Sequence, residues 1–248
     1  MSKSIHIFGF HSVESLLRTN PESIIKVFIH INRKDKRANE LVNTLTNQKI
    51  TFSTTDKNDL DRIAKGEIHQ GVISEVILPP LLNEESLFKS IIDNSLKPLI
   101  LVLDSIQDPR NLGACLRSAN AAGVDYVVIN KDGSAPINAV VHKTSAGAIN
   151  SLKIFHVTNL SRTIKEMQKR GIWVLGLDGN SKSTIYDVDL TDATAVVMGS
   201  EGKGIRQLIK KTCDQIVTIP MSGNIESLNV SVATGIALFE SKRQRESS

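Results

Sequence analysis

The chain has 248 residues, 40% of them hydrophobic and 23% charged, which is ordinary globular composition and excludes a disordered or fibrous protein. Its 30 Lys and Arg residues against 26 Asp and Glu give a formal charge of +4, which is compatible with a nucleic-acid partner but not diagnostic of one. The longest apolar runs, 98–103 and 193–198, are too short to span a membrane, and the start of the chain lacks a signal peptide, so we expect a cytoplasmic protein.

The first part of the chain is predicted to be a small α/β unit. Runs of β-branched residues predict strands at 24–31, 50–53 and 71–77. Apolar residues at helical spacing, with an Asp cap at the start of the second segment, predict helices at 35–45 and 56–63. Pro79 and Pro80 stop the last strand, and we interpret 79–97 as a linker that carries one helix. The predicted domains are therefore 1–78 and 98–248.

From residue 98 onward, strand and helix patterns alternate. The predicted strands are rich in apolar residues and lie at 98–104, 126–129, 172–177, 195–198 and 216–219. The predicted helices lie at 111–122, 158–170 and 228–245. Repeated strand–helix units imply a parallel sheet covered by helices, so the predicted fold class is α/β.

Several common catalytic signatures are absent from the sequence. There is no G-x-x-x-x-G-K-[ST] motif, which argues against a P-loop NTPase, and neither H-E-x-x-H nor G-x-S-x-G occurs. The six histidines are never paired at metal-ligand spacing, so we predict no metal site. Cys115 and Cys213 lie far apart in a chain without an export signal, which predicts free thiols.

Three polar loops follow predicted strands of the second domain, where open parallel α/β sheets place their ligands. The first loop, 104–117, carries Asn111 near the start of a helix and Arg117 further along it. Both residues could face a ligand, or Asn111 could be the helix N-cap and Arg117 a solvent-facing residue. The residues alone leave both interpretations open.

The second and third loops are rich in glycine and small polar residues. Gly199 and two further glycines let the backbone approach a ligand closely, with Glu201 among them as a hydrogen-bond partner, although a flexible turn fits as well. The third loop, 219–235, offers backbone donors and a helix start that suit the rim of an adenosyl or amino-acid group. Simple helix capping by Ser227 or Asn229 is the alternative there.

Taken together, the three loops resemble the three motifs of the SpoU (TrmH) family of RNA ribose 2′-O-methyltransferases, part of the SPOUT superfamily. The matching segments, in the family's order and spacing, are DPRNLGACLRSANAAG, VMGSEGKGI and IPMSGNIESLNVSVATGIALFE. The segments IFGFHSVESLL, KDKR and IHQGVISEV extend the similarity to the family's bacterial 23S rRNA guanosine-2′-O-methyltransferases over nearly the whole chain. Arg110 stands where relatives often carry His.

The resemblance implies both a fold and a reaction. Domain 1–78 is expected to bind RNA and to fold like ribosomal protein L30e. Domain 98–248 is expected to be a methyltransferase whose C-terminal segment forms a deep trefoil knot that binds S-adenosylmethionine. The implied enzyme is a homodimer without a metal or membrane partner, and it methylates a guanosine ribose in the peptidyl-transferase region of 23S rRNA.

The resemblance also assigns the site residues. The expected catalytic residues are Asn111, Arg117, Glu201, Ser227 and Asn229. The expected cofactor-binding residues are Gly199, Ile219, Leu228, Met221 and Leu177. A guanidinium with a pKa above about 12 is a poor base, so Arg117 is expected to hold an RNA phosphate and developing alkoxide charge, while a role as the base stays open.

Two basic runs are candidates for RNA contact. The first contains Arg33, Lys34, Lys36 and Arg37, and we expect it to contact phosphate. The second, 242–245, ends the last predicted helix. For both runs a solvated surface is the alternative interpretation.

Two other functions are compatible with the same motifs. One is a tRNA ribose 2′-O-methyltransferase, and the other is a non-catalytic rRNA-binding assembly factor. The long N-terminal domain with its HQGV segment favours rRNA over tRNA. The presence of all the expected catalytic residues together favours an active enzyme.

Overall fold

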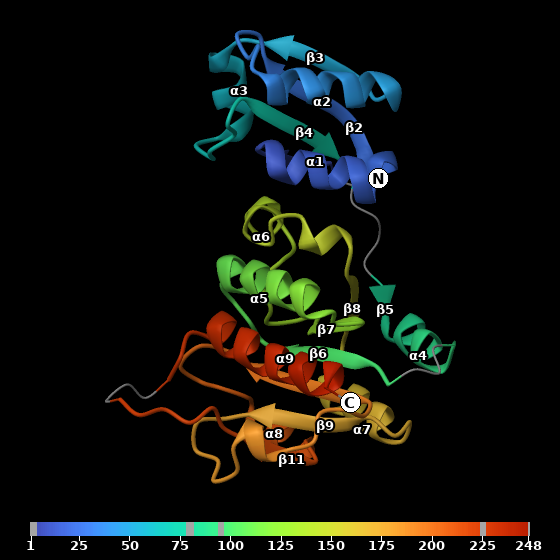
Figure 1. Ribbon diagram of the computed structural model, residues 1–248, viewed down its shortest axis with the longest axis vertical. Coiled ribbons are helices and arrows are strands. Elements are labelled where there is room, and N and C mark those ends of the chain that lie inside the picture. The colour runs from blue at the N-terminus through green and yellow to red at the C-terminus, as the bar shows by residue number, and fades with distance from the viewer. Residues whose placement is uncertain (1–3, 78–81, 94–96, 224–226, 248) are drawn as a thin grey trace. The chain divides into compact units, whose positions relative to one another are not determined.

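The computed structural model describes residues 4–77, 82–93, 97–223 and 227–247, and Figure 1 shows its elements in chain order. The chain divides into two compact units. The first unit combines residues 1–80 with 137–151, and the second combines 81–136 with 152–248. None of the helices in the described part of the chain is long and apolar enough to cross a membrane.

The first unit is built on a mixed sheet with the strand order β1-β4-β2-β3. Its strands are β1 (Ile5–Phe8), β2 (Ile24–His30), β3 (Phe52–Thr55) and β4 (Val72–Val76). Its helices are α1 (Phe10–Thr19), η1 (Pro21–Ser23), α2 (Lys36–Asn47) and α3 (Lys57–Ala64). The strands predicted at 24–31 and 71–77 are confirmed, as are the helices at 35–45 and 56–63. The strand predicted at 50–53 lies two residues further along the chain, and β1 and α1 were not predicted.

The helices of the first unit are fixed by capping and by their apolar faces. The side chain of Asp35 accepts a hydrogen bond from the backbone of Ala38 and so caps α2, and Asp56 caps α3 in the same way. Helices α1 and α2 bury one face each against β2, where the core residues are Phe10, Val13, Leu17, Val27, Ile29, Leu41 and Leu45. Each helix therefore shows the one-sided apolar pattern that packing onto a sheet requires.

Residues 137–151 belong to the first unit, although they lie inside the predicted second domain. They form α6 (Ala139–Thr144) and η2 (Ala148–Asn150). Ser15 Oγ donates a hydrogen bond to the carbonyl of Gly147 at 3.3 Å, and Lys143 forms an ion pair with Glu67 at 3.0 Å. A part of the chain far from the N-terminus thus completes the first unit.

The second unit contains a sheet with the strand order β11-β9-β10-β6-β7-β8-β5, and its neighbouring strands run parallel. The strands are β5 (Leu82–Asn83), β6 (Leu99–Asp104), β7 (Tyr126–Asn130), β8 (Lys153–Val157), β9 (Trp173–Leu177), β10 (Thr194–Gly199) and β11 (Gln215–Val217). Every residue of β6 is buried, as expected for a strand with a helix on each face of the sheet. The predicted parallel α/β fold is confirmed, while β5 and β8 were not predicted.

The helices of the second unit are α4 (Glu84–Asp93), α5 (Pro109–Ala122), α7 (Leu160–Gln168), η3 (Ile185–Asp187), α8 (Gln207–Thr212) and α9 (Val230–Glu246). Helix α9 lies against α5, as the red and green helices in Figure 1 show. Small residues permit this approach: Cys115 Sγ lies 3.4 Å from Thr234 Oγ1, and both side chains are buried. Helix α5 ends at Gly123, whose φ of 80° is the left-handed conformation that glycine adopts most easily.

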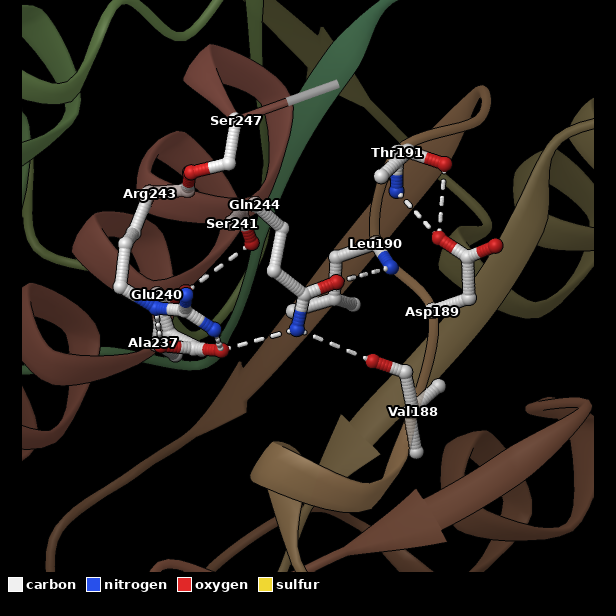
Figure 2. Close-up of polar contacts among 10 residues, drawn as sticks. All are labelled: Val188, Asp189, Leu190, Thr191, Ala237, Glu240, Ser241, Arg243, Gln244 and Ser247. Carbon is white, nitrogen blue, oxygen red and sulfur yellow. Dashed lines mark hydrogen bonds and ion pairs between the residues drawn. The ribbon is translucent and has the colours of Figure 1, made fainter.

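The C-terminal end of α9 is held to the segment between β9 and β10 (Figure 2). Gln244 accepts a hydrogen bond from the Leu190 N–H at 2.8 Å and donates one to the Val188 carbonyl at 3.1 Å. Arg243 makes a two-bond ion pair with Glu240. Arg245 donates to the carbonyls of Lys97, Leu190 and Asp192. The second basic run is therefore engaged inside its own unit.

Candidate active site

The three polar loops of the second unit meet at the side chain of Asn229. Its Nδ2 donates to Asn111 Oδ1 at 3.1 Å and to Glu201 Oε1 at 2.5 Å. Asn111 comes from the first loop, Glu201 from the second and Asn229 from the third. The fold thus brings together residues that lie up to 118 positions apart in the sequence.

Asn229 also caps α9, and this capping fixes how its amide points. Its Oδ1 accepts hydrogen bonds from the Ser231 N–H at 2.9 Å and from Ser231 Oγ at 2.6 Å. Because the oxygen is used by the cap, both N–H groups of the amide are directed to the other two motifs. Asn229 therefore caps α9 and also contacts the other two loops, so capping does not exclude a role in a site.

The start of α5 corrects one of the interpretations left open by the sequence. Asp108, rather than Asn111, is the N-cap: its carboxylate accepts a hydrogen bond from the Arg110 N–H at 2.8 Å, and Pro109 occupies the first helical turn. Asn111 is half-buried within that turn. Its side chain is free of capping, so it can serve the site.

Arg117 is not part of the Asn229 cluster. At 3.6 residues per turn it lies about 240° around the axis of α5 from Asn111 and roughly 9 Å further along it. Its side chain is exposed, and within the described residues it makes no hydrogen bond or ion pair. The structure therefore presents Arg117 as a free guanidinium on the surface of the second unit.

The glycine-rich loop after β10 folds back on itself. The Ser200 N–H donates to the Gly204 carbonyl at 3.1 Å, and the Gly204 N–H donates to the Ser200 carbonyl at 2.9 Å. A Cβ atom at Gly199 would lie 2.0 Å from the Gly204 carbonyl carbon, and Gly204 itself has a φ of 63°. Glycine is thus required here by the loop's own backbone, a reason that the sequence did not reveal.

The remaining expected site residues lie near the ends of the same strands. Leu177 is buried at the end of β9 and pairs with Val217 of β11, so Ile219 follows on the neighbouring strand. Met221 and Leu228 are half-buried, and Ser227 is exposed. Residues 224–226, in the middle of the third loop, lie outside the described residues.

The first basic run lies on the first unit around Phe10. The guanidinium carbons of Arg33 and Arg37 are 4.9 and 5.0 Å from the centre of the Phe10 ring. Arg37 forms a two-bond ion pair with Glu14 at 2.7 and 2.8 Å, and this hydrogen bonding lowers the pKa of Glu14. Its guanidinium fork is therefore already occupied.

The other members of that run differ in how free they are. Arg33 Nε lies 2.7 Å from the carboxylate of Asp35. Lys34 and Lys36 are exposed, and Lys36 approaches Glu40 only at 3.9 Å, across a pair of largely solvated side chains. The two lysines are thus the members most accessible to a phosphate.

No metal site and no reactive thiol is found among the residues that the structure describes. None of their His, Cys, Asp and Glu side chains form groups of three or more that could hold an ion. Cys115 and Cys213 are free thiols, as predicted. Burial raises the pKa of Cys115 to about 11 and that of Cys213 to about 12, so both are protonated at neutral pH.

Comparisons with known proteins bear on both units. Residues 98–239 match the SpoU rRNA Methylase family, and residues 6–80 match the family described as RNA 2′-O ribose methyltransferase substrate binding. A Haemophilus ducreyi protein named 23S rRNA (guanosine-2′-O-)-methyltransferase RlmB is 46% identical, over 98% of this chain and 98% of its own length. The Escherichia coli K12 protein of the same name is 44% identical, over 96% and 98%.

Solved structures show the same fold. The SpoU methyltransferase AviRb from Streptomyces viridochromogenes, in complex with the cofactor AdoMet, aligns with a TM-score of 0.81 and 22% identity, covering 99% of this chain and 92% of that one. The TrmH/SpoU tRNA modifying enzyme from A. aeolicus aligns with a TM-score of 0.56 and 32% identity, covering 66% and 85%.

Proposed function

The chain belongs to the SpoU rRNA methylase family, and we infer that it is an enzyme that transfers a methyl group from S-adenosylmethionine to the 2′-hydroxyl of a guanosine ribose in 23S rRNA. The observation that carries this inference is the meeting of all three motif loops at Asn229, in a chain that matches 23S rRNA enzymes from end to end. The family resemblance seen in the sequence is thereby confirmed.

The ends of β9, β10 and β11 have the chemistry that the cofactor needs. Leu177, Ile219 and Met221 supply apolar side chains, while Gly199 at the end of β10 and Leu228 just before α9 offer backbone groups to a ligand. When bound there, S-adenosylmethionine supplies a methyl group on a charged sulfonium, which is already a good leaving group. The main contribution of the protein is then alignment of the 2′-hydroxyl with that methyl group.

The Asn229 cluster is suited to this alignment. Asn229 holds the Glu201 carboxylate in place, and a fixed carboxylate favours a neighbouring positive charge. Because Asn111 uses its oxygen to accept from Asn229, its amide N–H groups point elsewhere and are available to the RNA. We propose that Ser227, whose side chain is exposed, joins them.

Arg117 supplies positive charge for the RNA. Its guanidinium stays protonated at neutral pH and presents a planar fork, which suits a phosphate or the developing alkoxide better than it suits proton abstraction. Its position on α5, away from Asn111, supports a homodimer in which the site is completed at the interface between the subunits.

The outer face of α9 is the proposed contact between the subunits. Val232 and Phe239 are 50% and 48% exposed, and Ile236 lies between them on the same face. The helical spacing of Val232, Ala233, Ile236, Ala237 and Glu240 forms a mostly small-residue stripe that predicts this contact from the sequence, but Ala237 and Glu240 are buried in their own unit. The proposed interface is therefore narrower than the small-residue stripe along α9.

Two features of the fold are proposed with the function. The first is the deep trefoil knot. The bonds from Gln244 and Arg245 to segment 188–192 support it, because these bonds hold α9 against the connection between β9 and β10. An L30e-like fold and RNA binding by residues 1–78 are supported by the match of 6–80 to the substrate-binding family. Within the predicted linker, 79–97, residues 82–93 form β5 and α4 and belong to the second unit. We propose that the enzyme acts in the cytoplasm.

The comparisons help to choose between an rRNA methyltransferase and the alternative of a tRNA methyltransferase. The tRNA enzyme from A. aeolicus covers 66% of this chain, whereas the rRNA relatives cover 96% or more. That difference favours 23S rRNA, and we propose the peptidyl-transferase region as the target. A non-catalytic assembly factor would have no need for the bonded cluster of Asn111, Glu201 and Asn229.

The test is mass-spectrometric mapping of ribose methylation on 23S rRNA and bulk tRNA, incubated with purified protein, S-adenosylmethionine and a chelator. We expect one methylated guanosine in 23S rRNA, none in tRNA, and none in either RNA with the Glu201→Gln variant. Methylation of tRNA alone would move the substrate to the alternative class. No methylation of either RNA, by a protein that still binds rRNA, would favour the assembly factor.

A further inference from the structure

The glycine-rich loop lies at the end of β10, and an aspartate stands at the same end of each neighbouring strand. Strand β10 pairs with β6 on one side and with β9 on the other. Asp104 is the last residue of β6 and pairs in register with Gly199. Asp178 directly follows β9, and the register that pairs Val197 with Gly176 carries it to the level of Gly199 from the other side.

Asp104 is bonded entirely by its surroundings. Its side chain is fully buried, one carboxylate oxygen accepts from Arg206 Nε at 2.7 Å, and the other accepts from the Arg206 backbone N–H at 2.9 Å. Ser105 Oγ adds a third bond at 3.2 Å. Burying a carboxylate costs free energy unless the carboxylate is paired and hydrogen-bonded in this way. The contact with Asp104 therefore holds the backbone at Arg206 in one position.

Asp178 makes the matching contact on the other side. Its carboxylate lies 2.8 Å from Lys210 Nζ in α8 and accepts a hydrogen bond from the Asn180 N–H. Burial raises the pKa of Asp178, but the bonds from Lys210 and Asn180 outweigh it and leave that pKa lowered. A Cβ atom at Gly204 would lie 3.9 Å from this carboxylate, which places Asp178 beside the loop.

We propose that Asp104–Arg206 and Asp178–Lys210 form a two-sided clamp that holds residues 199–206 in the shape required to bind the cofactor. The four clamp residues are positioning residues and take no part in the chemistry. This proposal rests on the proposed function, since it assigns the clamp to the S-adenosylmethionine site of that reaction.

The need for a clamp follows from the loop itself. The reciprocal bonds between Ser200 and Gly204 close its neck, but Gly202 and Gly204 both have positive φ and restrict the backbone little. Without an anchor at Arg206, the loop could pivot about β10 and carry Glu201 away from Asn229. Asp104 is fully buried and accepts bonds on both carboxylate oxygens, so its contact with Arg206 is the stronger anchor; the contact of the partly exposed Asp178 with Lys210 is the weaker one.

The test is calorimetric titration of S-adenosylmethionine into full-length variants, combined with single-turnover methylation of a 23S rRNA fragment. We expect Arg206→Gln to raise the Kd of the cofactor by about tenfold or more and Asp178→Asn by about threefold. Arg206→Lys keeps the charge and the backbone bond, so it should fall between wild type and Arg206→Gln. At saturating cofactor the methylation rate should recover to near wild type in all three variants, because bound ligand restores the loop.

Matched controls separate positioning from general stability. Lys211→Gln removes a neighbouring charge of α8 that has no ion pair within the described residues, and it should leave the Kd unchanged. Arg245→Ala destabilises the same unit at the far end of α9 and should also leave the Kd unchanged.

Two results would overturn the clamp. One is a Kd for S-adenosylmethionine in Arg206→Gln that equals the wild-type Kd. The other is an equal rise of that Kd in Arg206→Gln and Arg245→Ala, when the two variants have the same melting temperature. Failure of wild-type protein to bind the cofactor at all would overturn the proposed function, and the clamp with it.

Discussion

The two ends of α9 use similar side chains in opposite ways. At the N-terminal end, the exposed Asn229 donates to two other side chains, Asn111 and Glu201. At the C-terminal end, Gln244 and Arg245 bond to backbone groups just before β6 and between β9 and β10. The hydrogen bonds at the N-terminal end join side chains, which a ligand can rearrange. The hydrogen bonds at the C-terminal end satisfy backbone groups that have no other function.

This difference separates stability from function along one helix. Exposed hydrogen bonds between side chains contribute little to folding, because water replaces them on unfolding. Backbone carbonyls that lose a buried or half-buried partner are left unsatisfied, and that loss is costly. Substitutions at the N-terminal end should therefore reduce activity and spare stability, and substitutions at the C-terminal end should do the reverse.

The largest effect is expected from Asn229→Asp. Aspartate caps α9 as well as asparagine does, so the melting temperature should hold. It also places a second carboxylate beside Glu201 and removes the N–H donors to the cluster, so single-turnover methylation should fall by about 10²–10³-fold. Ser231→Ala is the matched control, because it removes only a hydroxyl bonded to the same cap. A rate loss in Ser231→Ala equal to that in Asn229→Asp would contradict the assignment.

Arg117→Lys is expected to have the next largest effect. An ammonium lacks the planar fork of a guanidinium, so Lys should lose much of the activity that Arg117→Ala loses, on the order of 10²-fold. Cofactor affinity should hardly change, since Arg117 lies away from the strand ends. Rates measured from pH 7 to 9 decide its role. A Lys variant that works well, with a rate that rises with pH, would make Arg117 the base instead.

Much of this arrangement could be predicted from the sequence, because the buried parallel strands are continuous apolar runs. The segment Leu99–Asp104 and the last helix were found within two residues of their observed bounds. Strand β5 was missed because two residues carry no period, and it exists only through its pairing with β8. Asn111 was a candidate cap because several polar residues precede the helix, and only the backbone shows that Asp108 is the cap.

The site was harder to predict than the fold, since its contacts join residues far apart in the sequence. The motifs identified which loops matter, but the bond from Asn229 to Asn111 spans 118 positions and depends on the completed sheet. The clamp pair Asp104 and Arg206 gave no local signal at all. The charge pattern of the second basic run is also typical of an RNA-binding surface. The pattern alone cannot show that Arg245 donates hydrogen bonds to three carbonyls of its own chain.

Arg245→Ala tests the C-terminal end directly. The part-buried Leu190 carbonyl loses its charged donor, while the exposed carbonyls of Lys97 and Asp192 turn to water, so the free energy of unfolding of the second unit should fall by about 1–2 kcal/mol. Single-turnover methylation at a temperature where the variant is folded should stay within about twofold of wild type, since the cluster at Asn229 is untouched. Lys242→Ala, one turn earlier on the helix, serves as control, because Lys242 makes only long contacts: 3.5 Å to the Ala121 carbonyl, 3.7 Å to the Glu246 carboxylate and 5.9 Å to the centre of the Phe239 ring. A melting temperature that drops equally in both variants would refute the distinction between them.

The smallest effect, and the most local one, is expected at Cys115, which lies between the two ends where α5 contacts α9. Burial raises its pKa to about 11, so at pH 8 it should resist thiol reagents in the native state. Because the folded state holds the proton more tightly than the unfolded state, its contribution to stability is complete below pH 9. That contribution is lost as the pH rises toward 11, and Cys115→Ala should flatten this part of the stability profile.

Labelling of Cys115 also reports on the helix itself, since the thiol is reached only when α9 separates from α5. Arg245→Ala should then accelerate labelling, whereas Asn229→Asp should not. Equal labelling rates in the two variants would mean that the C-terminal bonds do not hold α9 in place.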